Sequence, residues 1–144
     1  MQIELPLTAR EAKPGQFIHM KVNDPRYLLR RPISIAGTDP EKGLVEIIYR
    51  IVGKGTEAMS HLKEGDVVDS LGPLGTSFSM DKDHIVGIGC GIGIAPILFM
   101  ARQARPGQMT VVIGGRNKEE VFWQALFPDT VRKLMVTTDA GSYG

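Results

Sequence analysis

The sequence predicts a small antiparallel β barrel followed by an α/β domain that is built on a partial parallel sheet. In the first half, short runs that alternate apolar and polar residues are separated by turn signals such as Pro14-Gly15, as in antiparallel sheets. In the second half, strand-like and helix-like segments alternate, which is typical of parallel strands joined by right-handed crossovers. The change of pattern near Asp81 predicts a division into residues 1–80 and 81–144.

The barrel half is expected to contain strands near residues 15–22, 31–37, 43–52 and 65–75. These runs are rich in β-branched and aromatic residues and are bounded by Gly and Pro. Residues 55–65, "GTEAMSHLKEG", predict a short helix that Thr56 opens as the N-cap and Gly65 closes. Several short strands with one brief helix favour a small barrel.

The second half predicts strands over residues 84–90, 108–115 and 132–140, with helices over 94–104 and 118–127 between them. Pro96 falls in the first turn of the first helix, where its missing N–H costs nothing. In the second helix, three aromatic residues have the spacing of a packed face and are expected in the core: Phe122, Trp123 and Phe127.

Composition narrows the class of protein. The 144 residues are 42% apolar and 23% charged, as in soluble globular proteins, and the net charge of +1 gives no reason to expect nucleic acid or an anionic membrane as a partner. Glycines and a proline interrupt the apolar run near residues 85–100, so we expect no membrane span, and the first ten residues do not resemble a signal peptide. A single cysteine, Cys90, excludes an internal disulfide and fits a reducing cytoplasm.

The glycine-rich stretch "GIGCGIGIAP", residues 87–96, lies between a strand and a helix. Such a turn commonly binds a dinucleotide phosphate, because glycines let the backbone approach the anion and the helix start receives it. The pattern here is G-x-G-x-x-P, with Pro96 where the common fingerprint has glycine. The alternative is a tight turn without a ligand. Cys90 within the loop is more simply explained as a small tolerated residue than as a redox thiol.

The barrel half carries further groups that can hold phosphate. In "RRPISIAG", residues 30–37, Arg31 stands at a strand start and can bind a diphosphate as a planar fork. Ser34 lies on the opposite face by strand alternation and can reach the polar rim of a ring. Taken alone, these residues are more simply explained as a surface arginine pair and a half-buried serine.

The next strand strengthens the case for a ligand. Tyr49 can stack on a flat group and Arg50 can hold a phosphate oxygen. Gly55-Thr56 opens the short helix, whose N–H groups can take up more of the same diphosphate. Three such elements in one small barrel favour a bound dinucleotide, and the residues by themselves say no more than that.

The order R-P-x-S, I-Y-R, G-K-G-T and G-x-G-I-A-P resembles the ferredoxin–NADP reductase superfamily. Within it, the phrases "KPGQFIHMKV", "LLRRPISIAG", "VEIIYRIVGKGT", "GDVVDSLGPLG" and "VTTDAGSYG" are similar to electron-transfer subunits of NAD-dependent (class B) dihydroorotate dehydrogenases. The resemblance covers nearly the whole chain. It implies an FAD-binding barrel followed by an NAD-binding α/β domain.

The resemblance also implies roles for individual residues. Those expected to line the flavin and its diphosphate are Arg31, Pro32, Ile33, Ser34, Ile48, Tyr49, Arg50, Gly55 and Thr56. Those expected to form the nicotinamide-nucleotide loop are Gly89, Gly91, Gly93 and Pro96. Hydride transfer between the two rings needs no general acid or base, so no catalytic side chain is predicted. His19, His61 and His84 are widely separated, and no metal site is expected.

Two departures from the family pattern lead us to expect a truncated member or a fragment. Relatives continue into a cysteine-rich segment that ligates a [2Fe–2S] cluster, whereas this chain has only Cys90. They also carry at least one further barrel strand before the "KPGQF" strand.

In relatives, electrons from dihydroorotate reach the FMN of a catalytic partner subunit, cross the cluster to FAD, and leave to NAD⁺. The implied function is FAD-dependent electron transfer that supports orotate formation in pyrimidine biosynthesis, within a hetero-oligomer. One alternative is a related flavin module of another redox complex, and a second is a non-catalytic docking module. The sequence leaves open whether NAD or NADP is preferred, although Arg116 stands where it can touch an adenosine phosphate.

Overall fold

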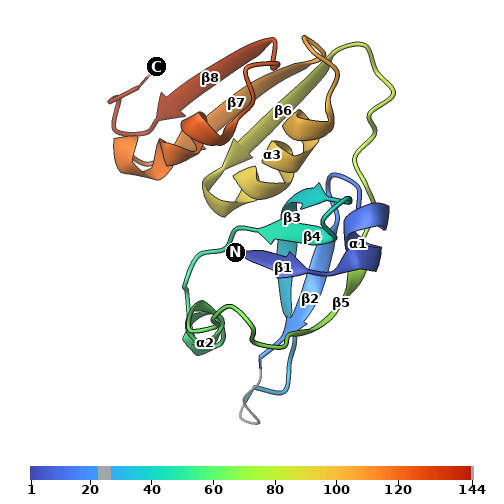
Figure 1. Cartoon of the computed structure of the whole chain (residues 1–144). Coiled ribbons are helices and arrows are strands. Elements are labelled where there is room, and N and C mark those ends of the chain that lie inside the picture. The colour runs from blue at the N-terminus through green and yellow to red at the C-terminus, as the bar shows by residue number, and fades with distance from the viewer. Residues whose placement is uncertain (23–26, 144) are drawn as a thin grey trace.

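The computed structural model describes residues 1–22 and 27–143, apart from the side chain of Phe122. It contains an antiparallel sheet of five strands in the order β1-β4-β3-β2-β5 and a parallel sheet of three in the order β6-β7-β8 (Figure 1). The strands of the first sheet are β1 (Gln2–Glu4), β2 (Phe17–Lys21), β3 (Arg31–Asp39), β4 (Leu44–Ile47) and β5 (Asp69–Leu74). This architecture confirms the predicted fold class.

Strand alternation builds the barrel core. β3 turns Ile33 and Ile35 inward and leaves Pro32 exposed, and the antiparallel neighbours β2 and β4 contribute buried aliphatic side chains in the same way. The members of this core from the three strands are Ile18, Met20, Ile33, Ile35, Val45 and Ile47. All of these core residues except Met20 are β-branched, as is typical of strands.

Two elements near the N-terminus were not predicted. β1 pairs antiparallel with β4, with Gln2 opposite Glu46, and helix α1 (Pro6–Glu11) begins with a proline at its first position. The predicted strand over residues 43–52 is too long, because β4 ends at Ile47. The register of β4 with β3 stops there, at the pair Ile35 and Ile47, so the residues that follow leave the sheet.

Helix α2 (Lys54–Ser60) is capped differently from the prediction. Gly53, not Thr56, is the N-cap residue, and the helix ends at Ser60 instead of Gly65. The hydroxyl of Thr56 reaches back from the third helical position, where it accepts the N–H groups of Val52 at 3.0 Å and Gly53 at 3.3 Å. These hydrogen bonds of the Thr56 hydroxyl to the residues before the helix are the physical reason that the helix begins before Thr56.

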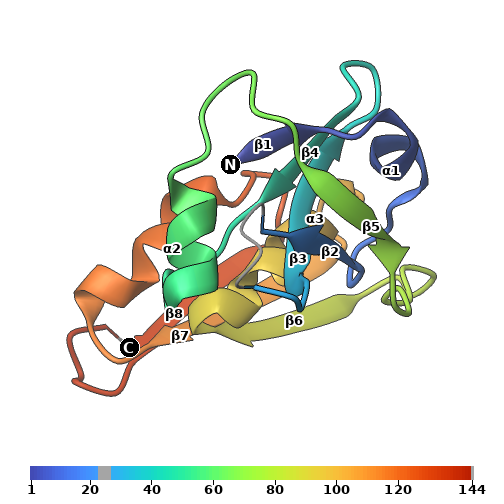
Figure 2. The same ribbon diagram turned by 90° about the horizontal axis from the view of Figure 1, so that it is seen from below.

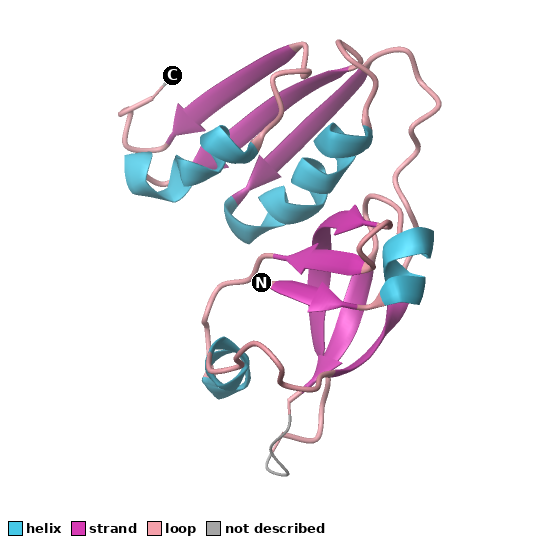
Figure 3. Ribbon diagram, viewed as in Figure 1, coloured by secondary structure: helices cyan, strands magenta, loops and turns pink. Residues whose placement is uncertain are grey.

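The parallel sheet consists of β6 (Ile85–Cys90), β7 (Met109–Gly115) and β8 (Lys133–Thr138). The short 3₁₀ turn η1 (Gly91–Gly93) and helix α3 (Ile94–Gln103) join β6 to β7, and η2 (Lys118–Leu126) joins β7 to β8. In Figure 3, α3 and η2 lie on the same side of this sheet. Parallel pairing of all three strands confirms the crossover prediction.

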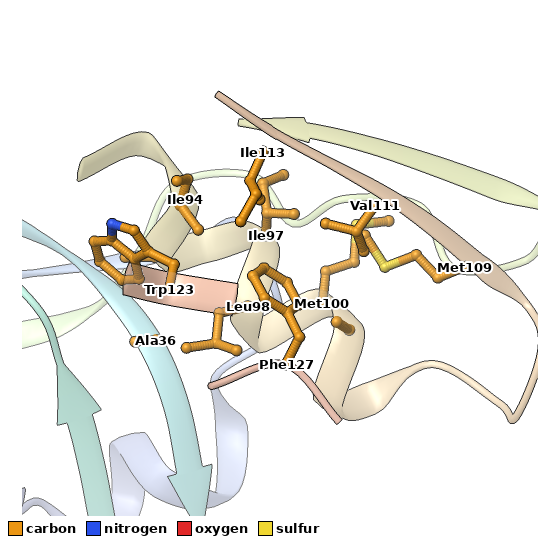
Figure 4. Packing of buried hydrophobic residues seen from close by; sticks show 12 residues of the cluster. Ala36, Ile94, Ile97, Leu98, Met100, Met109, Val111, Ile113, Trp123 and Phe127 are labelled. Atoms are coloured by element: carbon orange, nitrogen blue, oxygen red, sulfur yellow. The ribbon is translucent and has the colours of Figure 1, made fainter. Parts of the chain in front are cut away.

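The segment η2 is a 3₁₀ helix with non-helical backbone at Val121, not the regular α-helix that was predicted. The kink allows Val121 to pack against Gly115 while Trp123 and Phe127 reach the core. Figure 4 shows these two aromatic residues among the aliphatic side chains of α3 and β7. Their burial confirms that prediction, whereas the side chain of Phe122 lies outside the described residues.

Helix α3 packs against both sheets. Phe99 is buried in the barrel core, whereas Leu98 belongs to the core beneath the parallel sheet. At the end of α3, Arg102 donates from Nη1 to the carbonyl of Ala36 at 3.2 Å and to Glu46 Oε2 at 2.7 Å. Figure 1 shows α3 between the barrel strands and the parallel sheet, and in Figure 2, seen from below, the barrel strands overlap α3.

The connection between the two sheets spans residues 75–84, and the predicted division between residues 80 and 81 falls inside it. That division stays a prediction. Within the described residues, the helices are too short and too polar for any of them to cross a bilayer.

Candidate functional site

Two adjacent arginines at the start of β3 have different partners. Arg30 donates from Nη2 to both carboxylate oxygens of Asp69, at 2.8 and 2.9 Å, so it ties β3 to β5. Arg31 donates from Nη1 to the carbonyl of Leu29 at 2.5 Å and lies over the Tyr27 ring at 5.9 Å. Arg30 therefore has a structural partner in the sheet, and Arg31 is the arginine placed to meet a ligand.

The guanidinium of Arg31 lies directly against the first turn of α2. A Cβ atom added to Gly55 would stand 2.6 Å from Arg31 Nη2 and closer still to Nε. A side chain at position 55 would collide with the guanidinium, so glycine is needed for Arg31 to pack against the first turn of the helix. A fork of guanidinium donors beside free helical N–H groups is a favourable arrangement for a diphosphate.

The other predicted residues of β3 divide between the two faces. Ile33 points into the barrel core, so its side chain does not face a ligand, and only its backbone can do so. Ser34 is half-buried and lies opposite Phe17, and Pro32 is exposed opposite His19. The strand thus brings Arg31 toward α2, while Pro32 and Ser34 remain on the outer face.

The segment after β4 does not act as one unit. Ile48 packs against the core beneath the parallel sheet, whereas Tyr49 packs against the barrel core. Burial raises the pKa of the Tyr49 phenol above its ordinary value. Arg50 extends to η2, where its Nη2 lies 3.8 Å from Glu120 Oε1. The ion pair of Arg50 is therefore with the α/β half of the chain.

Exposed apolar side chains flank the Arg31 and Gly55 contact in the sequence. Leu28 and Leu29 are 88% and 77% exposed, and Ile51 and Val52 are 56% and 79% exposed. Each of these four side chains lies within a few residues of Arg31 or Gly55 in the chain. Among the larger hollows, one of about 660 Å³ lies between η2 and β8, away from this contact.

The glycine loop separates into residues with different roles. A Cβ on Gly89 would stand 3.2 Å from the Cα of Ile94, so this glycine lets α3 lie close to β6. Gly91 has a φ of +54°, and the space around Gly91 and Gly93 is open. Pro96 is the third residue of α3. Gly91 and Gly93 thus line an approach to the backbone, and Gly89 supports the packing beneath it.

A cluster at the carboxyl edge of the parallel sheet was largely missed from the sequence. Arg116 follows β7 directly and is held by Glu120 of η2, while its carbonyl accepts the N–H of Ala140 at 3.0 Å. Of this cluster, only Arg116 was identified from the sequence. The ion pair with Glu120 was not predicted, because that pair forms only when the chain turns back after β7. The helical i,i+4 spacing was the available signal.

Cys90 is exposed at the end of β6 and lies beside Gly114 of β7. A Cβ on Gly114 would stand 2.8 Å from the sulfur, so the thiol packs on that glycine. Among the described residues, no three His, Cys, Asp or Glu side chains are grouped so that they can hold a metal ion.

The residues present fit an FAD diphosphate at the start of β3 and α2. The cradle is one that a Cβ at Gly55 would fill, and a Cβ at Gly53 would meet nothing within 4 Å. Arg31 supplies positive charge there, and exposed aliphatic side chains adjoin it in the sequence. The [2Fe–2S] cluster does not fit this chain, because one cysteine cannot supply its thiolate ligands.

A barrel joined through one helix to a parallel sheet with a glycine loop defines the class of ferredoxin–NADP reductase-like flavin modules. Residues 1–78 match the family model described as the oxidoreductase FAD-binding domain. The chain belongs to that family.

Among curated proteins, the chain is 38% identical over 151 residues to the dihydroorotate dehydrogenase B (NAD(+)) electron transfer subunit of Desulforamulus reducens, covering 100% of this chain and 57% of that protein. It is 43% identical over 140 residues to the subunit of the same name from Streptococcus mutans, covering 93% of this chain and 54% of the relative. The chain therefore spans about half the length of the curated relatives that it matches.

Solved structures agree with the fold. A chain from a study of the NADH-dependent reduced ferredoxin-NADP oxidoreductase has a TM-score of 0.83 at 33% identity, covering 99% of this chain and 52% of that one. Ferredoxin-NADP+ reductase from Plasmodium falciparum has a TM-score of 0.66 at 15% identity, covering 90% of this chain and 58% of that one. The second likeness concerns the fold alone.

Proposed function

We propose that this chain is the FAD-binding and NAD-binding part of an electron-transfer module that serves a partner dehydrogenase. The observation that carries the proposal is the contact of Arg31 with Gly55, which joins a guanidinium to the start of a helix in a family that binds FAD. FAD, when bound, supplies hydride exchange with a nicotinamide. The chain itself supplies binding and orientation.

The roles of the residues follow from their positions. Arg31 and the first turn of α2 bind the diphosphate, and Thr56 fixes that turn through its bonds to Val52 and Gly53. Tyr49 and Ser34 border the ring. Gly91 and Gly93 admit the phosphates of NAD at the carboxyl edge of the parallel sheet. Aliphatic side chains such as Val52 and Ile51 exclude water from the ring.

We propose dihydroorotate oxidation as the reaction that the module serves, because curated relatives at 37–43% identity are named as electron transfer subunits of that enzyme. The partner is then an FMN-containing catalytic subunit in a hetero-oligomer. The single cysteine of this chain cannot ligate a [2Fe–2S] cluster, so the residue roles proposed here concern FAD and NAD. An exposed free thiol at Cys90 supports a reducing compartment, and we propose the cytoplasm.

A titration of the purified chain with FAD, followed by flavin fluorescence, tests the proposal. Arg31→Gln removes the fork at the helix start and is expected to weaken FAD binding roughly tenfold or more, as loss of a charged hydrogen bond does. Arg30→Gln is the matched control, because its guanidinium is already paired with Asp69. It is expected to lower stability while leaving FAD affinity nearly unchanged. Equal loss in both variants, or no FAD uptake by the unaltered chain, would contradict the proposal.

A second candidate is a flavin module of another redox complex. It is favoured by the TM-score of 0.83 to a chain from the NADH-dependent reduced ferredoxin-NADP oxidoreductase study. Both candidates require FAD, so the partner distinguishes them. Stable association of the flavin-loaded chain with a purified dihydroorotate dehydrogenase catalytic subunit, measured by size-exclusion chromatography, supports the first. A flavin-loaded chain that does not associate supports the second.

A further inference from the structure

Arg116 occupies a position at which nucleotide-binding sheets read the adenosine end of a dinucleotide. It is the first residue after β7, the strand that follows the glycine loop and α3 (Figure 1). In sheets of this kind, a side chain after the second strand meets the ribose 2′ position. An acidic residue there favours the hydroxyl of NAD, and an arginine accommodates the extra phosphate of NADP. This chain has both, Arg116 and Glu120, in contact.

The backbone holds Glu120 in place. Asn117 caps the start of η2, and its Oδ1 accepts the N–H groups of Glu119 at 3.1 Å and Glu120 at 3.2 Å. On the other side, a Cβ on Gly115 would stand 3.1 Å from the Cβ of Glu120. The absence of a side chain at Gly115 thus brings the carboxylate next to the end of β7.

Arg116 donates three hydrogen bonds to the carboxylate of Glu120. The backbone N–H of Arg116 donates to Oε2 at 3.1 Å, its Nε donates to Oε1 at 2.9 Å, and its Nη2 also donates to Oε1. The side chain of Glu120 is only 18% exposed, whereas that of Arg116 is 74% exposed. The guanidinium therefore faces solvent with a fixed negative charge beside it.

Arg50 approaches the same carboxylate from the barrel half, with Nη2 at 3.8 Å from Oε1 of Glu120. One carboxylate thus stands between two guanidinium groups. Glu120 is ionised in the neutral range, and hydrogen bonds from Arg116 lower its pKa further, to about 2.

We propose that Glu120 makes the site selective for NAD over NADP by holding Arg116 away from the 2′ position of the adenosine ribose. The inference rests on the proposed binding of NAD at this sheet edge and adds the residue that selects the nucleotide. A 2′-phosphate brings further negative charge to a site where Nε and Nη2 of Arg116 already donate to Glu120 and where that carboxylate repels the added charge. A 2′-hydroxyl is uncharged, so the carboxylate does not repel it.

The test compares binding of NADH and NADPH, and of AMP and 2′-phospho-AMP, to the purified chain by calorimetry. Glu120→Gln removes the charge but keeps the size, so it is expected to raise the ratio of NADPH to NADH affinity roughly tenfold or more. NADH affinity is expected to change by less than about threefold. The gain for NADPH should shrink as salt is raised, and it should vanish in the double variant Arg116→Gln/Glu120→Gln.

Asp39→Asn is the matched control. It breaks another exposed ion pair, with Lys42, in the turn between β3 and β4, and it is expected to leave the ratio unchanged. An unchanged ratio in Glu120→Gln would overturn the inference, as would a loss of NADH affinity with no gain for NADPH, since Glu120 would then bind the ribose itself.

Flavin titration on the same samples separates the two proposals. If FAD binds but the nucleotide ratio does not respond, the inference on Glu120 fails and the proposed function stands. If the chain takes up neither FAD nor any of the four nucleotides, both fail.

Discussion

Neighbouring residues of one type serve different purposes in this chain. Arg30 and Arg31 are adjacent, yet one ties β3 to β5 through Asp69 and the other lies on Gly55 at the start of α2. Arg31 is the first residue of β3 and Arg30 lies just before the strand, so the two side chains have different neighbours. A sequence shows a pair of cations, and only the partner atoms show which cation is available for a phosphate.

The acidic group Glu120 predicts a pH dependence of stability. Its pKa falls from its ordinary value of 4.5 to about 2, mainly through hydrogen bonds from Arg116. A carboxyl whose pKa is lower in the folded state stabilises the fold above its unfolded pKa, and this stabilisation is lost as pH falls through the folded value. We expect the urea midpoint to fall more steeply in the unaltered chain than in Glu120→Gln between pH 4.5 and about 2.

Parallel pH profiles for the two proteins across that window would show that the ion pair contributes nothing to folding. The comparison needs no bound nucleotide, so it is independent of the selectivity test.

At the scale of elements, α3 and β6 depend on glycine where they touch. Gly87 and Gly89 lie on the face of β6 that α3 covers, next to Ile97 and Ile94. The alternate residues Val86 and Ile88 point to the other face and are exposed. Two of the glycines in the loop motif therefore serve packing, and the open positions Gly91 and Gly93 are the ones left for a phosphate.

Replacement of Gly89 by valine should destabilise the fold. The new side chain would meet the backbone of Ile94 and the side chain of Ile97, which cannot both withdraw, so we expect a loss of about 1–3 kcal/mol in the free energy of unfolding. Chemical denaturation followed by circular dichroism measures it. Gly93→Ala, at an open position with a helical φ of −63°, is the control and should be neutral or slightly stabilising. Equal stability of the two variants would refute this account of the loop.

At the scale of the whole molecule, one helix joins two cores. α3 buries Phe99 in the barrel and Leu98 beneath the parallel sheet, and Arg102 adds hydrogen bonds to Ala36 and Glu46. The exposed face of the parallel sheet presents Val86 and Ile88, an unusual feature, because parallel sheets are commonly covered on both faces.

The shared helix predicts a single cooperative unfolding transition. Trp123, the only tryptophan, reports on the α/β half by fluorescence, and far-ultraviolet circular dichroism reports on the whole chain. Phe99→Ala leaves a cavity in the barrel, and we expect a loss of about 3–5 kcal/mol with both probes still coincident. If the Trp123 signal kept its midpoint while the dichroism midpoint fell, the two halves would unfold independently.

The sequence determined the fold class and most of the elements. Alternating strands before Asp81, strand and helix alternation after it, and the strand, glycine and helix order around Gly91 all reflect local periodicity and backbone sterics, which short windows of residues carry. The family resemblance then predicted FAD and NAD as the bound nucleotides.

Tertiary structure decided the partners of the charged residues and the roles of the glycines. The contact of Arg31 with Gly55, the carboxylate of Glu120 between Arg50 and Arg116, and the support of α3 by Gly89 each join residues from different elements. The kink at Val121 and the early end of β4 were also decided by contacts between elements. The physical reason is that these features depend on which surfaces meet after folding, and neither periodicity nor propensity encodes that meeting.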